Sequence, residues 1–334
     1  MDLAYQKPYP KLDAQKMKGR DGKDFLADPD LLAAANVALA LGRPLLLTGE
    51  PGCGKTDFAF AAASGLVENS SAAEPPTEVL AHYVRTETRA HDLLYHYDAV
   101  RRFGDAQTGG DVGKRRASYP QNYIKLEALG LGLMSPVRRV VLIDEIDKAP
   151  RDLPNDLLRE LDQDRFEIPE IPPGQMRNDG ALEPGQEHFV RRMTPPADAP
   201  KPFVIITSNV ERQLPDAFLR RCVFFYIPFP SQKRLGDILN AHFSDAPVLL
   251  KKNALSLFAE LRKDALRLTK KPATAELLDW VSALVKVFEP AETERRLTEV
   301  LAQKDTDGIP WQALPALGCL LKLREDLETL GVVE

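Results

Sequence analysis

The 334-residue chain has little cysteine: Cys53, Cys222 and Cys319 lie far apart and form neither a metal-ligand set nor a disulfide framework. We therefore expect a reducing compartment, the cytoplasm. Long apolar runs are also missing. The longest, such as residues 31–41, are too short to cross a bilayer, and residues 1–20 lack the apolar core of a signal peptide. The sequence thus favours neither a membrane protein nor a secreted one.

Aromatic residues make up only 7 % of the chain, which leaves few side chains for stacking on nucleic-acid bases. The 44 Lys and Arg are outnumbered by 49 Asp and Glu, and the formal net charge is −5. This balance makes nucleic acid an unfavoured partner, although a local basic patch stays open. The length predicts two domains, and 44 % hydrophobic with 28 % charged residues is typical of globular proteins.

Three regions follow one another along the chain. Residues 1–27 are polar and interrupted by proline and glycine, so we expect an N-terminal arm. Residues 28–230 alternate short apolar runs with helical stretches, which is typical of an α/β domain with a parallel sheet flanked by helices. The first helix should begin after Asp28 and end at Gly42. Buried strands are predicted at residues 44–48, 139–143, 203–207 and 223–227.

From residue 231 the strand-like runs stop, and apolar residues recur at helical spacing, as at Leu277, Val281 and Leu284. Core packing is the simplest explanation of such a stripe. Residues 231–334 are therefore predicted to form a smaller, all-helical domain. The stretch from Trp311 to Leu330 is expected to be a final helix, interrupted near Pro315 or Gly318.

Two long polar insertions lie inside the α/β region, near residues 103–122 and 165–192. The first is rich in glycine, carries the basic triplet Lys114, Arg115 and Arg116, and is expected to be a loop. The second has alternating residues at 166–168 and 188–190, which predicts a β-hairpin with a long tip. Loops of this size in a compact domain are uncommon unless they are functional.

A phosphate-binding loop follows the first predicted strand. Its residues fit the pattern G-x-x-x-x-G-K-[ST] at every fixed position, and a helix starts at Asp57. Glycines let backbone N–H groups face a phosphate; Lys55 would reach the β- and γ-phosphates of a nucleotide, and Thr56 would bind Mg²⁺. The expected nucleotide-binding residues of this segment are Gly49, Glu50, Pro51, Gly52, Cys53, Gly54, Lys55, Thr56 and Asp57.

Polar residues end the later strands as well. Asp144 and Glu145 follow a buried strand, where Asp144 can hold Mg²⁺ and Glu145 can act as the base for an attacking water. Asn209 ends the next strand and can hydrogen-bond that water or the γ-phosphate. The pair Arg220 and Arg221 precedes the last strand, where it could meet the γ-phosphate of a neighbouring subunit as an arginine finger. Solvated arginines and a simple turn-forming Asn are the plainer alternatives.

This ordered set of motifs, followed by a helical lid, resembles the AAA+ ATPases over about residues 25–290. The segments 144–150 and 214–221 and the two insertions look like the MoxR branch of that family. The resemblance implies a Walker A motif with Lys55 and Thr56, a Walker B motif with Asp144 and Glu145, and sensor 1 at Asn209. It also implies rings, usually hexamers, that remodel proteins, often beside a partner with a von Willebrand A domain.

The resemblance fails at one position. Family members generally have an arginine, sensor 2, at the start of a lid helix, whereas Lys270 and Lys271 occupy this region here. Lys271 is our candidate, although it lacks the bidentate fork of arginine. Cys53 is interpreted as a small residue at a tolerant position, since no resolving cysteine lies near it in sequence.

The sequence thus predicts an enzyme that hydrolyses ATP with Mg²⁺ and acts on a protein client as a ring of its own copies. Two other functions stay open: a nucleic-acid motor or loader that uses the basic triplet, and a nucleotide-gated scaffold with slow turnover. GTP is a third possibility for the substrate, although no [NT]-K-x-D motif for guanine is present.

Overall fold

The computed structural model describes residues 10–67, 76–174, 181–304 and 308–333. Contacts between residues divide the chain into two compact units. Of the described residues, the first unit takes those up to Lys18, those of Ala27–Thr48 and those of Thr56–Tyr226. The second takes Gly19–Leu26, Gly49–Lys55 and those from Ile227 onward. The limits predicted at residues 27 and 230 stay predictions.

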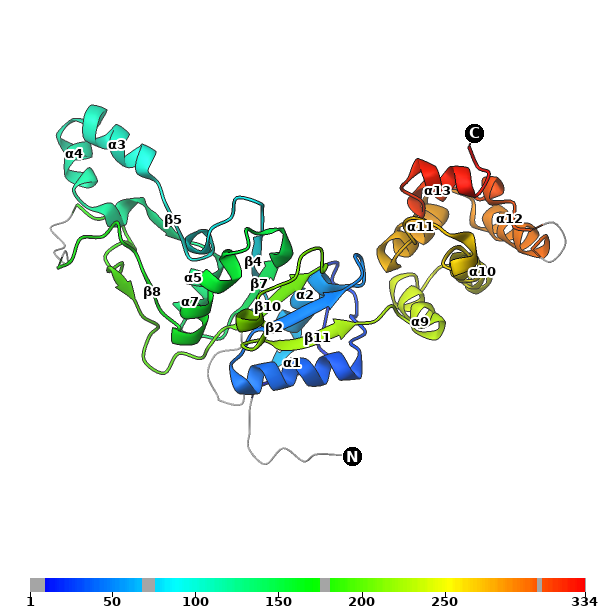
Figure 1. Ribbon diagram of the computed structural model, residues 1–334, viewed down its shortest axis with the longest axis horizontal. Coiled ribbons are helices and arrows are strands. Elements are labelled where there is room, and N and C mark those ends of the chain that lie inside the picture. Colours follow the sequence, from blue (N-terminus) through cyan, green and yellow to red (C-terminus); the bar gives the residue numbers. More distant parts are fainter. Residues whose placement is uncertain (1–9, 68–75, 175–180, 305–307, 334) are drawn as a thin grey trace. The chain divides into compact units, whose positions relative to one another are not determined.

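A five-stranded sheet forms the centre of the first unit, with the strand order β11-β2-β10-β7-β4 (Figure 1). Its strands are β2 (Leu45–Gly49), β4 (Val79–Tyr83), β7 (Val140–Asp144), β10 (Phe203–Ser208) and β11 (Val223–Ile227). The four predicted strands are present. The sequence missed β4, an edge strand whose residues are only half-buried and whose apolar run is interrupted by His82.

Helices flank this sheet. Pro29 to Leu41 form α1, which begins where the Asp28 carboxylate accepts hydrogen bonds from the backbone N–H groups of Asp30 and Leu31 and ends at the left-handed Gly42, as predicted. Outside the insertions, the unit also contains α2 (Lys55–Gly65), α5 (Ala128–Leu133), α6 (Leu153–Asp156), α7 (Leu158–Gln163) and α8 (Asp216–Leu219), with short 3-10 turns η1 (Ala90–Leu93) and η3 (Ile146–Lys148).

The direction of the strands determines where the polar strand ends lie. The pairs β2–β10, β10–β7 and β7–β4 are parallel. Parallel neighbours place their carboxyl ends at the same edge of a sheet, where open α/β sheets bind their ligands. β10 lies between β2 and β7, so the segment after β10 emerges between the phosphate loop after β2 and the carboxylates that end β7.

The first insertion is helical, and the predicted loop was wrong. Helices α3 (Ala99–Thr108) and α4 (Gly110–Ala117), with the 3-10 turn η2 (Pro120–Tyr123), extend from a two-stranded sheet of β5 (Tyr95–Tyr97) and β6 (Ile124–Leu126). Asp98 caps α3 through the N–H of Arg101. Gly113 serves packing, because a Cβ there would lie 2.7 Å from the carbonyl oxygen of Asp105. Two of the glycines that indicated a loop, Gly109 and Gly113, therefore allow the two helices to approach.

The second insertion contains the predicted hairpin with a different return strand. β8 (Phe166–Glu167) pairs antiparallel with β9 (Arg192–Met193), whereas the alternation had indicated residues 188–190. The pairing is completed by an ion pair between Glu167 and Arg192 with an N–O distance of 3.0 Å. Part of the expected tip, residues 175–180, lies outside the described residues.

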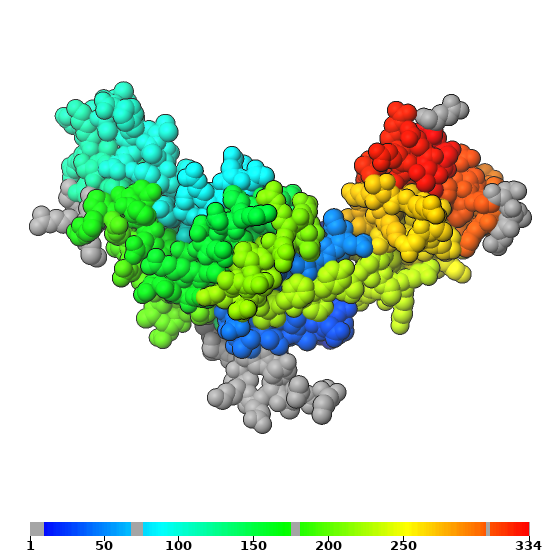
Figure 2. All heavy atoms as spheres, in the orientation of Figure 1, coloured from blue at the N-terminus to red at the C-terminus, as the bar shows by residue number. Residues whose placement is uncertain are grey.

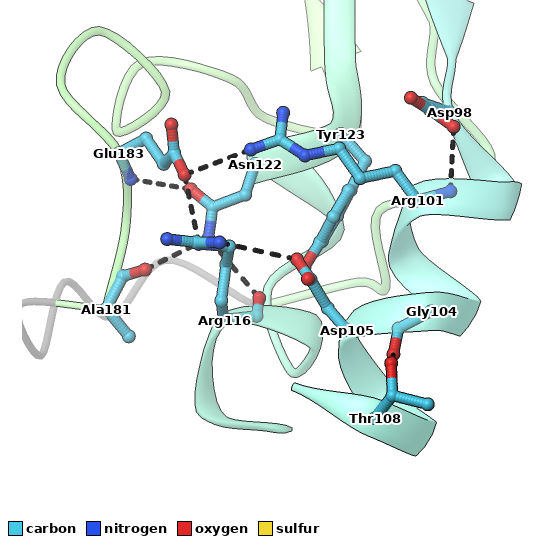
Figure 3. Close-up of polar contacts among 10 residues, drawn as sticks. All are labelled: Asp98, Arg101, Gly104, Asp105, Thr108, Arg116, Asn122, Tyr123, Ala181 and Glu183. Carbon is cyan, nitrogen blue, oxygen red and sulfur yellow. Dashed lines mark hydrogen bonds and ion pairs between the residues drawn. The ribbon is translucent and has the colours of Figure 1, made fainter. Parts of the chain in front are cut away.

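The two insertions are joined by hydrogen bonds centred on Asn122 (Figure 3). The Asn122 side chain is buried; its Nδ2 donates to the carbonyl oxygen of Ala181 over 3.0 Å, and its Oδ1 accepts from the backbone N–H of Glu183 over 2.6 Å. The Glu183 carboxylate is paired with Arg116 of α4 at 3.0 Å and with Arg101 of α3 at 3.4 Å. One polar side chain and one ion-pair cluster therefore connect segments about sixty residues apart.

A second group of contacts stiffens the helical pair itself. The Tyr123 hydroxyl donates to Asp105 over 2.7 Å, and Arg116 lies 3.5 Å from the same carboxylate. The tyrosine hydrogen bond and the arginine charge both lower the pKa of Asp105, which keeps it ionised. In Figure 3 Arg116 lies between the two carboxylates of Asp105 and Glu183.

The second unit is helical beyond Ile227. Its helices are α9 (Gln232–His242), α10 (Val248–Leu261), α11 (Thr274–Lys286), α12 (Pro290–Ala302) and α13 (Arg324–Thr329), with 3-10 turns η4 (Asp264–Leu266), η5 (Trp311–Ala313) and η6 (Leu317–Cys319). They pack around Phe258 and Trp280. The stretch from Trp311 to Leu330 is interrupted near Pro315 and Gly318, as predicted, and is more broken than expected, into η5, η6 and α13. The carbonyl of Pro315 accepts from the Trp280 indole N–H over 2.8 Å.

The N-terminal arm is better fixed than expected in its described part. β1 (Lys11–Leu12) pairs antiparallel with β3 (Leu66–Val67), and Met17 is buried. Lys23 Nζ donates to the carbonyl of His242 over 2.7 Å. Figure 2 shows the heavy atoms of the chain coloured along the sequence, with its first described residues in blue. No helix among the described residues is both long and apolar enough to traverse a bilayer.

Replacing Asn122 with Ala should separate the two insertions. The change leaves the N–H of Glu183 and the carbonyl of Ala181 without their partner, which costs about 1–3 kcal/mol when such groups are buried. We expect faster amide hydrogen exchange in α3, α4 and residues 181–186, with slow exchange kept in β7 and β10. Thr108→Ala, which removes an exposed hydrogen bond to Gly104 of the same helix, is the control. Unchanged exchange in Asn122→Ala would contradict the link.

Candidate active site

The loop between β2 and α2 has the conformation that phosphate binding requires. Gly52 and Gly54 have φ angles of 74° and 91°, a backbone conformation that residues other than glycine rarely adopt. Gly52 also lies where a Cβ would be 3.1 Å from the Cβ of Ala273. The chain enters α2 at Lys55, so the free N–H groups of the first turn follow the glycines directly.

Lys55 is 6 % exposed, and its ammonium is held by the loop itself. Nζ donates to the carbonyl oxygens of Gly49 at 2.9 Å and Glu50 at 3.0 Å. Pro51 and Asp57 are exposed, the latter in the first turn of α2. Burial raises the pKa of the Cys53 thiol, so the nucleophilic thiolate is disfavoured and a redox role loses support.

The Asp144 carboxylate, only 7 % exposed, is the centre of the site in the first unit. Its Oδ1 accepts from the hydroxyl of Thr207 at 2.6 Å and from that of Thr56 at 3.0 Å, with its Oδ2 at 3.2 Å from Thr56. A buried carboxylate is costly unless hydrogen bonds compensate it. Two hydroxyls, one after the phosphate loop and one on β10, therefore fix Asp144 at the end of β7.

Glu145 has a left-handed backbone with φ of 58°, a conformation that costs a non-glycine residue about 1–3 kcal/mol. Its N–H donates to the Thr207 hydroxyl over 2.8 Å. Its side chain accepts from Asn209 Nδ2 at 3.1 Å on one oxygen and pairs with Lys148 at 2.5 Å on the other. That hydrogen bond raises the pKa of Lys148. Both predicted partners, Glu145 and Asn209, thus lie together.

Asp147 positions the segment after β10. Its Oδ2 accepts from the backbone N–H groups of Asn209 at 3.1 Å and Glu211 at 2.9 Å. Lys148, the next residue, pairs with Glu145 and not with Asp147, whose Oδ2 accepts from backbone N–H groups. The role of Thr207 was also missed. Its position two residues before Asn209, on a strand next to β7, was the available signal.

The two arginines that end α8 differ in their surroundings. Arg221 is paired with Asp162 over 2.7 Å and donates to the carbonyl of Ala217. Arg220 is exposed. Among the described residues, neither guanidinium forms a hydrogen bond or an ion pair with Asp144 or Glu145. The site of the first unit therefore consists of Thr56 and the ends of β7 and β10, without an arginine.

In the second unit, Lys271 forms an ion pair with Asp264. A different cation contacts the phosphate loop: Arg262, at the end of α10, lies 3.0 Å from the Glu50 carboxylate. The sequence did not indicate Arg262, because its partner Glu50 lies 212 residues away in the chain.

The family model of the AAA domain, dynein-related subfamily, matches residues 44–222, more than half of the chain. The chain belongs to this family. Residues 44–222 are accordingly an AAA domain, and the helices from α9 onward follow it in the chain. The match ends at Cys222, just after the two arginines of α8, and it includes both insertions.

Two solved structures resemble this AAA-family chain. NtrX from Brucella abortus in complex with ADP is 15 % identical, with 90 % of this chain and 57 % of NtrX covered and a TM-score of 0.37. The FIGL-1 AAA domain in complex with ADP is 15 % identical, with 79 % of this chain and 65 % of that domain covered and a TM-score of 0.32. This chain spans less than two thirds of either one. No curated protein matches it.

Thr207→Val should impair hydrolysis while preserving the fold. Valine has nearly the same shape but neither donates to Asp144 nor accepts from the N–H of Glu145, and hydrogen bonds to charged groups contribute about 1.5–3 kcal/mol. We expect a fall in kcat of at least roughly tenfold. Thr207→Ser, which keeps the hydroxyl, should retain most of the activity. Equal phosphate release by the Val and Ser variants would show that the hydroxyl has no such role.

Proposed function

We propose that this protein is a MoxR-like ATPase that works as a ring of its own copies and uses ATP hydrolysis to remodel a protein client. The observation that carries the proposal is the hydrogen-bonded group of Thr56, Asp144, Thr207, Glu145 and Asn209. It unites a phosphate-loop hydroxyl, a buried carboxylate and a second carboxylate held by an amide, which are the groups needed to bind a triphosphate and activate a water.

In this proposal Lys55 and the N–H groups at the start of α2 bind the phosphates. Glu145 accepts a proton from the attacking water, and Asn209 holds the carboxylate in position and contacts the same water. The contact of Lys148 with the other oxygen of Glu145 must lengthen when the carboxylate turns to a water. Glu145 is thus placed to act as a base, while its ion pair with Lys148 restrains the carboxylate.

Mg²⁺ fits the groups that are present. The Thr56 hydroxyl and the Asp144 carboxylate are hard oxygen donors, and both are already directed at one another at 3.0 Å. Protein sites use one or two such groups for this ion and leave its other positions to phosphates and water. Among the described residues no cluster of three or more His, Cys, Asp or Glu could hold a metal. The ion would neutralise charge on the β- and γ-phosphates.

The positions of Arg220 and Arg221 support a ring. Cleavage of a γ-phosphate is accelerated by an arginine that meets the developing charge, and neither Arg220 nor Arg221 contacts Glu145 in its own chain. Both are exposed at the end of α8. We propose Arg221, or its neighbour Arg220, as a finger for the next subunit of a hexamer, which requires Arg221 to leave Asp162.

The client is proposed to meet the two insertions. Val100 and Phe103 of α3 and Val112 of α4 are exposed at 83 %, 67 % and 75 %, and no described residue covers them. Because Asn122 and Glu183 join the insertions, movement of one should carry the other. A partner with a von Willebrand A domain remains our candidate for the client.

The structure gives little support to the nucleic-acid alternative. Arg116 of the basic triplet is paired with Asp105 and Glu183, so its charge is neutralised within the chain. Slow turnover as a gated scaffold is disfavoured because Glu145 is present and held by Asn209. We retain neither as a second proposal.

Mixing two inactive variants tests the shared site. Glu145→Gln should bind ATP without hydrolysing it, and Arg221→Ala should fail because its neighbour receives no finger. In a mixed ring, a subunit with Glu145 intact can lie next to one with Arg221 intact. We expect phosphate release from the mixture at a clear fraction, on the order of one quarter, of the wild-type rate, as complementation across an interface requires.

Two controls accompany this mixture. Lys55→Ala, which loses the phosphate-binding ammonium, should not complement Glu145→Gln to the same extent, because it binds no ATP. Arg220→Ala shows which of the two arginines acts. Full turnover by monomeric wild-type protein, or a mixture as inactive as its parts, would contradict the shared site.

A further inference from the structure

Arg262 joins three segments of the second unit. Its guanidinium lies 3.4 Å from the ring centroid of Phe229. One nitrogen donates to the carbonyl of Pro272 over 2.6 Å, and another lies 3.0 Å from the carboxylate of Glu50. The side chain is only 14 % exposed. A planar guanidinium combines stacking with two directed hydrogen bonds, which lysine does not reproduce.

The phosphate loop packs against the same region at a second point. A Cβ on Gly52 would lie 3.1 Å from the Cβ of Ala273 and 3.3 Å from that of Ala275. The backbone of the loop therefore packs against side chains at the start of α11. The Glu276 carboxylate closes this turn by accepting from the N–H of Ala273. Residues Gly49–Lys55 consequently belong by their contacts to the helical unit, whereas Thr56 belongs to the α/β unit.

We propose that Arg262 is a positioning residue for the phosphate loop. By holding the Glu50 carboxylate and the Pro272 carbonyl together, it fixes the loop against the start of α11 and keeps the backbone N–H groups directed at the β- and γ-phosphates. Arg262 acts through Glu50 and does not itself contact the nucleotide. The affinity for nucleotide therefore depends on the helical unit.

The charge of Glu50 distinguishes a positioning role of Arg262 from direct contact between Arg262 and the phosphates. An arginine that met the phosphates itself would be strengthened by removal of Glu50, because the carboxylate both occupies the guanidinium and repels phosphate. A positioning arginine loses its effect with Glu50. The variants Glu50→Ala, Arg262→Ala and the double variant thus give opposite results under the two readings.

The experiment measures ATP hydrolysis by the full chain at varied ATP, with ADP affinity from a fluorescent analogue. We expect Glu50→Ala and Arg262→Ala each to raise KM for ATP roughly tenfold, the scale of a charge-assisted hydrogen bond, with kcat within about threefold of wild type. The double variant should equal either single one. Arg262→Lys, which keeps the charge and loses the fork, should fall between Arg262→Ala and wild type.

Arg295→Ala is the matched control, since it removes an arginine ion pair with Glu292 on the surface of α12 and should leave KM unchanged. Additive effects in the double variant, or a lower KM in Glu50→Ala, would overturn the proposal. So would a loss of thermal stability in Arg262→Ala with unchanged KM, which would mark a structural role alone. The inference rests on nucleotide binding and not on the client: wild-type protein that binds no ATP would instead refute the proposed function.

Discussion

The buried carboxylate of Asp144 is the group on which the candidate active site depends. Left alone at the end of a buried strand it would be costly, and it is stable there because the hydroxyls of Thr56 and Thr207 donate to it. These two hydrogen bonds join the helix after the phosphate loop, the carboxylate strand and the strand between them. Thr207 also accepts from the N–H of Glu145. The same threonine therefore helps to hold Glu145 in its strained, left-handed backbone, which turns the side chain toward Asn209.

The second constraint is how the phosphate loop divides its contacts. Lys55 and the glycines pack with the helical unit, while Thr56 begins the part of α2 that belongs to the α/β unit. Arg262 and Glu50 form an ion pair that holds the loop within the helical unit.

Much of the fold and site could be predicted because short-range signals determine them. The glycine pattern before Lys55 and the carboxylates Asp144 and Glu145 follow apolar strands whose burial is visible in sequence. The half-buried edge strand β4 could not be found, since its burial depends on the neighbouring β7. The helices α3 and α4 were hidden because Gly109 and Gly113 indicate turns in sequence but close packing in space. Arg262 was missed because its partner Glu50 lies 212 residues away.

The central claim, that Asp144 organises ATP hydrolysis in this AAA-family protein, is tested most directly by phosphate release from Asp144→Asn in Mg²⁺ and ATP. Asparagine keeps the shape and one acceptor for the two threonines, so the fold should be retained, but the negative charge that would hold the metal is gone. We expect wild-type protein to hydrolyse ATP and the variant to lose at least roughly a hundredfold in turnover, as expected when metal-assisted phosphoryl transfer fails. Turnover by Asp144→Asn at the wild-type rate would contradict the account.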